Sequence, residues 1–260
     1  MVTYGKNIGD ALMEEMHRLN HTKYINILIS GDVGMIPLYQ EMLGVMRKLS
    51  RYQLSMLRFF ISDDRVMPYH GNSYQELGEK SQYLQSRFVD VAVSEGLLDQ
   101  AQVALYYSQQ RYESERDPGL EILNRRYFDL GMRIDIALLL TRYDGSFAGM
   151  DSACYCHDWD NKRYFWNPEY EGPGCVTCSL KMVRQASLVC SVAAVPEDVW
   201  CNLVPDLSGM PDRNFVTRCG RVVPCPSDRQ EFFDEERIFP FAATQFCRQL
   251  AIMFGQPMAG

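Results

Sequence analysis

Short apolar runs alternate along this chain with longer segments whose apolar residues recur every three or four positions. The runs at Tyr24–Ser30, Leu57–Ile61 and Ile134–Thr141 are rich in aliphatic residues, which is typical of buried parallel strands. Helical spacing over residues 7–19 and 36–48 is typical of amphipathic helices. This alternation predicts an α/β protein, a three-layer α/β/α sandwich with a mainly parallel, Rossmann-like sheet.

The remainder of the chain carries weaker signals of the same kind. Residues 146–174 are rich in Asp, Asn, aromatic residues, Pro and Gly, and are expected to form a long irregular loop. We expect residues 1–260 to form one domain that includes this Cys- and aromatic-rich loop. Further strands are expected near Val103–Tyr106 and at Ser187–Val195, and further helices at Asn72–Ser94, Gly119–Leu130, Pro196–Leu203 and Pro240–Phe254.

Composition narrows the class of protein. The 260 residues carry a net charge of −7, which disfavours a nucleic-acid partner because phosphate backbones attract basic surfaces. Apolar runs stay well short of the roughly 20 residues that a membrane-spanning helix needs, so no membrane association is expected. The polar N-terminal segment does not resemble a secretory signal, and a cytoplasmic location is therefore expected.

All nine cysteines lie between Cys154 and Cys247. The motifs Cys154-Tyr155-Cys156-His157 and Cys175-Val176-Thr177-Cys178 have spacings found in zinc sites. A strand over 175–180 would direct its two cysteines to opposite faces, so one ion could not bind both. We therefore expect reduced thiols and no metal, with a structural zinc ion as the alternative.

Polar residues follow three of the predicted strands, where ligands bind in open α/β sheets. The first strand end, Ser30-Gly31-Asp32-Val33-Gly34, could present backbone N–H groups to an anion. The second, Ser62-Asp63-Asp64-Arg65, offers two carboxylates and a guanidinium for proton transfer or for binding a polyol. The third is Asp144-Gly145-Ser146. Taken singly, the first and third motifs are more typical of ordinary turns, and the second is equally compatible with one.

Together, these motifs resemble those of the 6-phosphogluconolactonase and glucosamine-6-phosphate deaminase family. Lactonases carry Ser-Gly-Gly-Ser/Thr-Thr-Pro, Ser-Asp-Glu-Arg-x-Val-Pro and Leu-Leu-Gly-x-Gly-x-Asp-Gly-His at the corresponding strand ends. Arg65 favours the lactonases, whereas His70 followed by Ser73-Tyr74 is similar to a deaminase variant. The matching positions are Ser30, Gly31, Ser62, Asp63, Arg65, Pro68, Asp135, Leu138, Leu139, Asp144 and Gly145, and more loosely Tyr39.

The resemblance implies a cytoplasmic hydrolase that converts 6-phosphogluconolactone to 6-phosphogluconate in the pentose phosphate pathway, without metal or nucleotide cofactor. It implies a phosphate loop that includes Gly31, Asp32 and Gly34, and contacts from Arg65 and His70 to the sugar acid. It also implies a catalytic group made of Asp63, Asp144 and Ser146.

Three departures point to a loss of this activity. Ser146 stands where the family has its catalytic histidine, and a serine hydroxyl cannot act as a general base near neutral pH. Asp32 places a carboxylate in the phosphate loop, and Val33 and Gly34 replace hydroxyl-bearing residues. Glu197 stands where family members often have a phosphate-binding lysine. Lactonase turnover is therefore expected to be absent or reduced. The alternatives are a non-catalytic binding or scaffold protein and, third, a deaminase or isomerase.

An aromatic group in residues 159–170 has two interpretations. Its members could form a small satellite core beneath the loop, or a patch that contacts a protein partner, because Trp and Tyr are frequent anchors of interfaces. The group comprises Trp159, Tyr164, Phe165, Trp166 and Tyr170.

Overall fold

The computed structural model describes residues 8–65, 76–108, 117–141, 164–167, 175–193, 214–216, 222–224 and 250–252. Its helices are α1 (Ile8–Arg18), α2 (Ile36–Met46), α3 (Arg51–Met56), α4 (Glu79–Leu84), α5 (Asp90–Ser94), α6 (Pro118–Asp129) and α7 (Leu180–Arg184), with short helical turns η1 (Val33–Met35), η2 (Gln85–Val89) and η3 (Gln100–Gln102). Its strands are β1 (Ile25–Ile29), β2 (Leu57–Ile61), β3 (Asp63–Arg65), β4 (Glu76–Leu77), β5 (Val103–Ala104), β6 (Tyr107–Ser108), β7 (Ile136–Thr141), β8 (Cys175–Thr177), β9 (Leu188–Ala193), β10 (Asn214–Val216), β11 (Val222–Pro224) and β12 (Leu250–Ile252).

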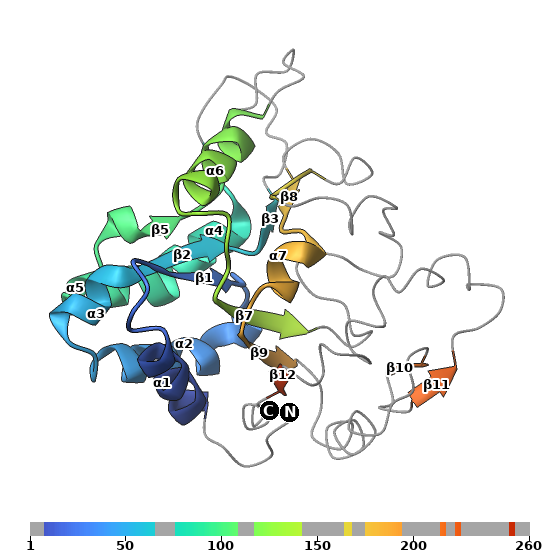
Figure 1. Cartoon of the computed structure of the whole chain (residues 1–260). Helices are drawn as coiled ribbons and strands as arrows, with labels where there is room; N and C mark the ends of the chain where they lie inside the picture. Colours follow the sequence, from blue (N-terminus) through green and yellow to red (C-terminus); the bar gives the residue numbers. More distant parts are fainter. Residues whose placement is uncertain are drawn as a thin grey trace.

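A six-stranded sheet with the order β12-β9-β7-β1-β2-β5 forms the centre of the fold (Figure 1). Every neighbouring pair in it is parallel. The chain moves from β1 outward through β2 to β5, and then returns to the other side of β1 at β7. The strand order therefore reverses between β1 and β7, where doubly wound sheets leave a crevice at the carboxyl ends of the strands.

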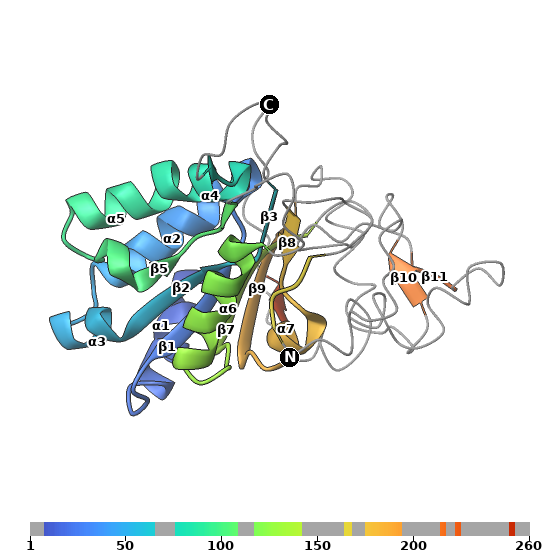
Figure 2. The same ribbon diagram turned by 90° about the horizontal axis from the view of Figure 1, so that it is seen from above.

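Helices cover both faces of the sheet, as the sequence pattern predicts. Figure 2 shows α2, α4 and α5 on one side of the sheet and α6 on the other. Two successive residues of β2 mark the two faces, because side chains alternate along a strand. Phe59 lies 5.2 Å, between ring centroids, from Phe88 of η2, whereas Phe60 lies 6.0 Å from Tyr127 of α6.

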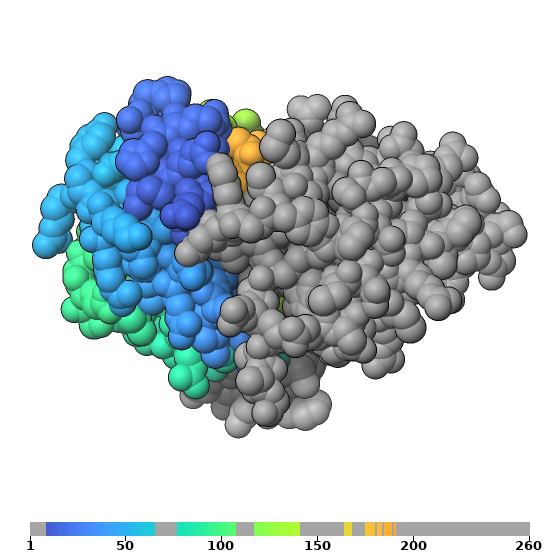
Figure 3. Space-filling view, turned by 90° about the horizontal axis from the view of Figure 1, so that it is seen from below, coloured from blue at the N-terminus to red at the C-terminus, as the bar shows by residue number. Residues whose placement is uncertain are grey.

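The outer surface on the α2 side is built from the first half of the chain. Helices α1 and α2 pack against each other, and the space-filling view shows them gathered beside α3 and the 76–108 segment (Figure 3). Leu12 and Met16 of α1 and Leu38 and Met42 of α2 are fully buried or nearly so. The apolar positions that predict these helices are thus the positions that face the core.

Two predicted helices are wrong in part. Residues 76–77, inside the predicted helix Asn72–Ser94, form β4, which pairs with β6, and helix begins only at Glu79. Residues 250–252, inside the predicted C-terminal helix, form β12, which extends the sheet alongside β9. Both short segments take up backbone partners from distant parts of the chain, and such pairing overrides local helical spacing.

Of the three aromatic residues of the 159–170 loop that the structure describes, Phe165 and Trp166 belong to the main core, whereas Tyr164 is 39% exposed. Phe165 is fully buried, and its ring lies 6.1 Å from Phe60 and 5.9 Å from Tyr127 between centroids. Trp166 is only 6% exposed and pairs through its backbone with Thr177. These two side chains extend the core beneath α6, in place of the separate satellite core that the sequence suggests.

Within the described ranges, no helix combines the length and the apolar character that crossing a membrane requires.

Candidate functional site

Polar side chains from the ends of β1 and β2 meet at the carboxyl edge of the sheet. Ser30 follows β1, Ser62 follows β2, and Asp63 begins β3, and all three are at least 97% buried. The parallel pairing of β1 with β2 brings these strand ends together, since Ile29 is in register with Ile61. The expected convergence of the first two motifs is therefore present in the structure.

A chain of hydrogen bonds fixes the direction of each hydroxyl group in this cluster. The backbone N–H of Leu140 in β7 donates to Ser30 Oγ at 3.3 Å, and Ser62 Oγ donates to Asp63 Oδ1 at 2.6 Å. The two serine oxygens lie 3.0 Å apart. Because the single hydroxyl proton of Ser62 is directed to Asp63, the hydroxyl of Ser30 is the donor between them.

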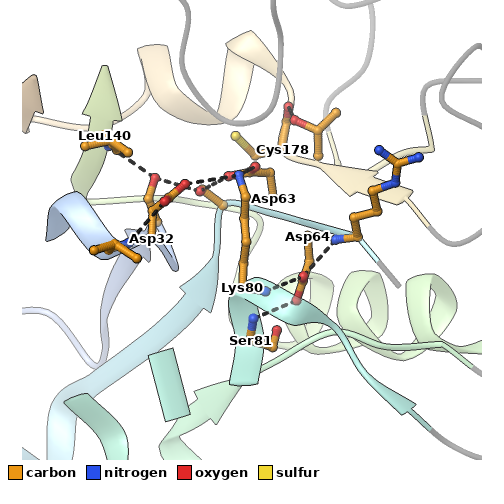
Figure 4. Close-up of polar contacts among 12 residues, drawn as sticks. Asp32, Asp63, Asp64, Lys80, Ser81, Leu140 and Cys178 are labelled. Atoms are coloured by element: carbon orange, nitrogen blue, oxygen red, sulfur yellow. Dashed lines mark hydrogen bonds and ion pairs between the residues drawn. The ribbon is translucent and has the colours of Figure 1, made fainter. Parts of the chain in front are cut away.

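Lys80 completes the cluster from the other side of the crevice (Figure 4). Its ammonium group donates a hydrogen bond to Asp63 Oδ2, so both oxygens of the Asp63 carboxylate have partners. The Nζ atom also lies 3.7 Å from Asp32 Oδ2. Exposure differs between the two acids, because the Asp63 side chain is 4% exposed and that of Asp32 is 34% exposed. The pair with Asp63 is thus the buried one, and the more exposed pair with Asp32 contributes about 0–1 kcal/mol.

Asp64 holds the start of the helix that carries Lys80. Its carboxylate accepts backbone N–H groups from Lys80 and Ser81 at 2.9 Å each, and from Arg65 at 2.7 Å. Gly78 makes this approach possible, because a Cβ atom at that position would overlap the Asp64 carboxylate. Burial raises the pKa of Asp64 to about 6, against the lowering effect of these hydrogen bonds. Asp64 therefore anchors the backbone on which Lys80 stands.

The loop after β1 provides an acceptor for a backbone N–H group of its own. The carboxylate of Asp32 accepts the N–H of Val33 at 3.0 Å and caps η1. Gly31 lets the loop approach the backbone carbonyl of Lys80, which a Cβ atom at position 31 would overlap. Tyr39 in α2 donates its hydroxyl proton to the carbonyl oxygen of Ser30 at 2.5 Å. Burial raises the pKa of Tyr39, so the phenol remains a donor at neutral pH.

The predicted site residues are brought together only in part. Gly31, Asp32 and Asp63 all lie around Lys80, as described above, and Gly34 lies in η1 beyond Asp32. Arg65 is exposed at the end of β3, where its backbone is in register with Cys175 of β8. Three further predicted residues, His70, Asp144 and Ser146, lie outside the residues that the structure describes, and so does Glu197.

Lys80 is the functional candidate that the sequence does not single out. It lies inside a predicted helix, away from the strand-end motifs. The first turn of a helix favours acidic residues because of the helix dipole, so a lysine there requires compensating carboxylates. The sequence carries no signal of this mismatch, because the predicted helix begins at Asn72 and only the structure places Lys80 in a first turn. Lys80 also adds a cation to the negative groups that the sequence places at this edge of the sheet, because its ammonium group lies between Asp32 and Asp63.

The cysteines near the crevice are buried thiols. Cys175 and Cys178 are at most 1% exposed, and burial together with the charge of Asp63 raises the pKa of Cys178 well above its usual value. The predicted strand over 175–180 ends at Thr177, and Ser179 caps α7 directly after it. Among the described residues, no group of three or more His, Cys, Asp or Glu side chains could hold a metal ion. The second predicted cysteine pair, Cys154 and Cys156, lies outside the described residues.

Comparison with known proteins finds similarity in structure and none in sequence. The sequence matches no protein-family model and no curated protein. A 6-phosphogluconolactonase from Thermotoga maritima superposes with a TM-score of 0.50 at 16% identity, over 71% of this chain and 77% of that one. A 6-phosphogluconolactonase from Trypanosoma cruzi gives a TM-score of 0.50 at 14% identity, over 82% of this chain and 83% of that one.

These similarities agree with the α/β fold that the described residues form. At such low identity the superposition establishes the fold alone, and the chemistry of the site has to be argued from the residues of this chain. The chain is a divergent protein with the fold of the 6-phosphogluconolactonases.

Proposed function

We propose that this chain is a 6-phosphogluconolactonase-like protein in which hydrolysis of 6-phosphogluconolactone is absent or strongly reduced. The observation that carries the proposal is the buried ion pair of Asp63, whose two carboxylate oxygens each already accept a hydrogen bond, one from Ser62 and one from Lys80. A general base needs an oxygen that can accept a proton from water or substrate within hydrogen-bond distance. Asp63 has both oxygens engaged, and one partner is a cation.

The phosphate loop supports the same proposal. An incoming phosphate would need the N–H groups at the start of η1, and Asp32 already accepts the one from Val33. Two negative charges about 4 Å apart repel by about 4 kcal/mol at an effective dielectric constant of 20. The sequence adds a third reason, because a serine at position 146 cannot replace a histidine as general base.

Hydrolysis of 6-phosphogluconolactone, followed against its spontaneous rate at the same pH, tests the proposal. We expect no acceleration beyond the background, and a rate typical of an active lactonase would overturn the proposal. Ser146→His supplies a second arm. We expect this substitution alone to leave the rate at background, because Asp32 still occupies the loop.

A non-catalytic binding protein on the same fold is the second candidate. It is favoured by the internal hydrogen bonds of Ser30, Ser62, Asp63 and Asp64, since each of these four side chains already has a partner among the described residues. Thermal unfolding in the presence of phosphosugars distinguishes the two functions. A ligand that binds the folded state raises the melting temperature by mass action, even where turnover is absent.

A further inference from the structure

The two acids that face Lys80 are held in different ways. Asp63 hydrogen-bonds directly to the ammonium group, is 4% exposed, and is fixed on its other oxygen by Ser62. Asp32 lies 3.7 Å from the same ammonium group, beyond hydrogen-bond distance, and is 34% exposed. Asp63 therefore holds the Lys80 ammonium group in place, and Asp32 faces that ammonium group from the solvent side.

The contacts of Asp32 are those that a bound oxyanion would make. One carboxylate oxygen accepts the Val33 N–H at the start of η1, and the other faces the Lys80 ammonium. Backbone N–H groups at a turn and a lysine ammonium are the usual donors to phosphate and carboxylate groups. Asp32 thus covers both donors with a carboxylate of its own.

We propose that Asp32 is an internal counter-ion that takes the place of an anionic ligand group. Its carboxylate prevents phosphate from binding at this site. The inference rests on the proposed function and deepens it, because it names one side chain as the reason that an anionic ligand does not bind. In this arrangement the donors remain assembled, and the carboxylate of Asp32 covers them.

The donors do not depend on Asp32 for their positions. Asp63 holds the ammonium group of Lys80, and Asp64 holds its backbone N–H together with that of Ser81. Gly31 keeps the loop against the carbonyl oxygen of Lys80. Removing the charge of Asp32 should therefore leave the Lys80 ammonium group in place and take away the carboxylate that faces it from the solvent side.

The test uses Asp32→Asn, which removes the charge and keeps an oxygen that can cap η1, because Asn and Asp are equally good at such positions. Asp32→Ser, also a good capping residue, is an independent second variant in case the first does not fold. Binding of inorganic phosphate to the full chain is measured by titration calorimetry at constant ionic strength. We expect both variants to bind phosphate at least about tenfold more tightly than the wild type, a factor that corresponds to about 1.4 kcal/mol.

Two controls make the result specific. Asp129→Asn removes one exposed acid at the end of α6. The neighbouring Leu130 accepts a hydrogen bond from Asn26 near the start of β1, whereas Asp32 follows the end of that strand. That change should leave phosphate affinity at the wild-type level. The triple variant Asp32→Asn/Asp63→Asn/Lys80→Gln removes the ammonium group without leaving a buried charge alone. It should abolish the gain in phosphate affinity.

The inference is overturned if wild type and both Asp32 variants bind phosphate equally, if Asp129→Asn gives the same gain, or if the gain survives the loss of Lys80. Lactone hydrolysis by the wild-type chain does not enter this comparison. Measurable turnover would therefore remove the proposed function and leave the role of Asp32 to be decided by phosphate affinity.

Discussion

The ammonium group of Lys80 donates a hydrogen bond to the carboxylate of Asp63, which lies 17 positions earlier in the chain. The contact joins the first turn of α4 to the start of β3, which follows β2 after one residue. It also gives Asp63 a cationic partner on one oxygen while Ser62 occupies the other. A carboxylate that the sequence suggests for catalysis is thus held in a buried ion pair.

Removing only the cation of this pair should destabilise the fold. Lys80→Met leaves the carboxylate of Asp63 buried without its counter-ion, and breaking a buried pair from one side costs about 3 kcal/mol or more. The double variant Lys80→Met/Asp63→Asn should lose less than the single one, because no charge is left buried. Urea unfolding measures both, with Lys48→Met as an exposed control expected to stay within about 0.5 kcal/mol of wild type. A double variant less stable than the single one would contradict this account.

Gly31 should not tolerate a side chain. A Cβ atom at this position would overlap the backbone carbonyl of Lys80, so Gly31→Ala should lower the free energy of unfolding by about 1–3 kcal/mol. Gly44 in α2 offers a matched control, because nothing lies within 4 Å of the Cβ atom that Gly44→Ala would add. Alanine there should stabilise the helix by about 0.5–1 kcal/mol. Equal effects of the two substitutions in chemical denaturation would show that the close approach at Gly31 is unimportant.

Asp64 should make stability depend on pH in the acidic range. Its pKa rises on folding from 3.8 to about 6, so the folded state binds the proton more tightly than the unfolded state. The resulting stabilisation is complete below pH 3.8 and is lost as pH rises through about 6. At 1.36 kcal/mol per pKa unit, the loss is about 3 kcal/mol.

The measurement is the difference in free energy of unfolding between wild type and Asp64→Asn from pH 4 to pH 7, because subtraction removes the contributions of other groups. We expect this difference to fall as the pH rises and to level off above about pH 7, one unit past the pKa of Asp64. Asp129→Asn, at an exposed position, should give a difference that stays flat. A difference that grows with pH would mean that the carboxylate of Asp64 is stabilised by folding.

The buried thiols should be inert toward alkylation in the folded protein. Cys178 and Cys190 are fully buried, and burial raises the pKa of Cys190 to about 12 and that of Cys178 well above its usual range. The thiolate is the reactive form, so iodoacetamide at pH 8 should modify these two positions only after unfolding. Peptide mass spectrometry with and without urea provides the readout. Modification of Cys178 at the same rate in both conditions would contradict its burial.

The long elements could be predicted because each carries its own pattern. Strand β2 coincides with the predicted Leu57–Ile61, and α2 begins at the predicted Ile36. The short elements could not be predicted, because their partners lie far away in sequence. Strand β3 exists through pairing with β8, where Asp63 is in register with Thr177, and β12 exists through pairing with β9.

The sequence by itself determined the long buried strands, their mainly parallel arrangement and the convergence of Ser30, Gly31, Asp32 and Asp63 at one edge, because apolar runs must be buried and parallel strands end together. Only the tertiary structure decided which charges face each other in the crevice. Lys80 reaches Asp32 and Asp63 because Asp64 anchors its helix and glycines 31 and 78 permit close approach. Such contacts depend on the packing of a helix against strand ends, which no local pattern encodes.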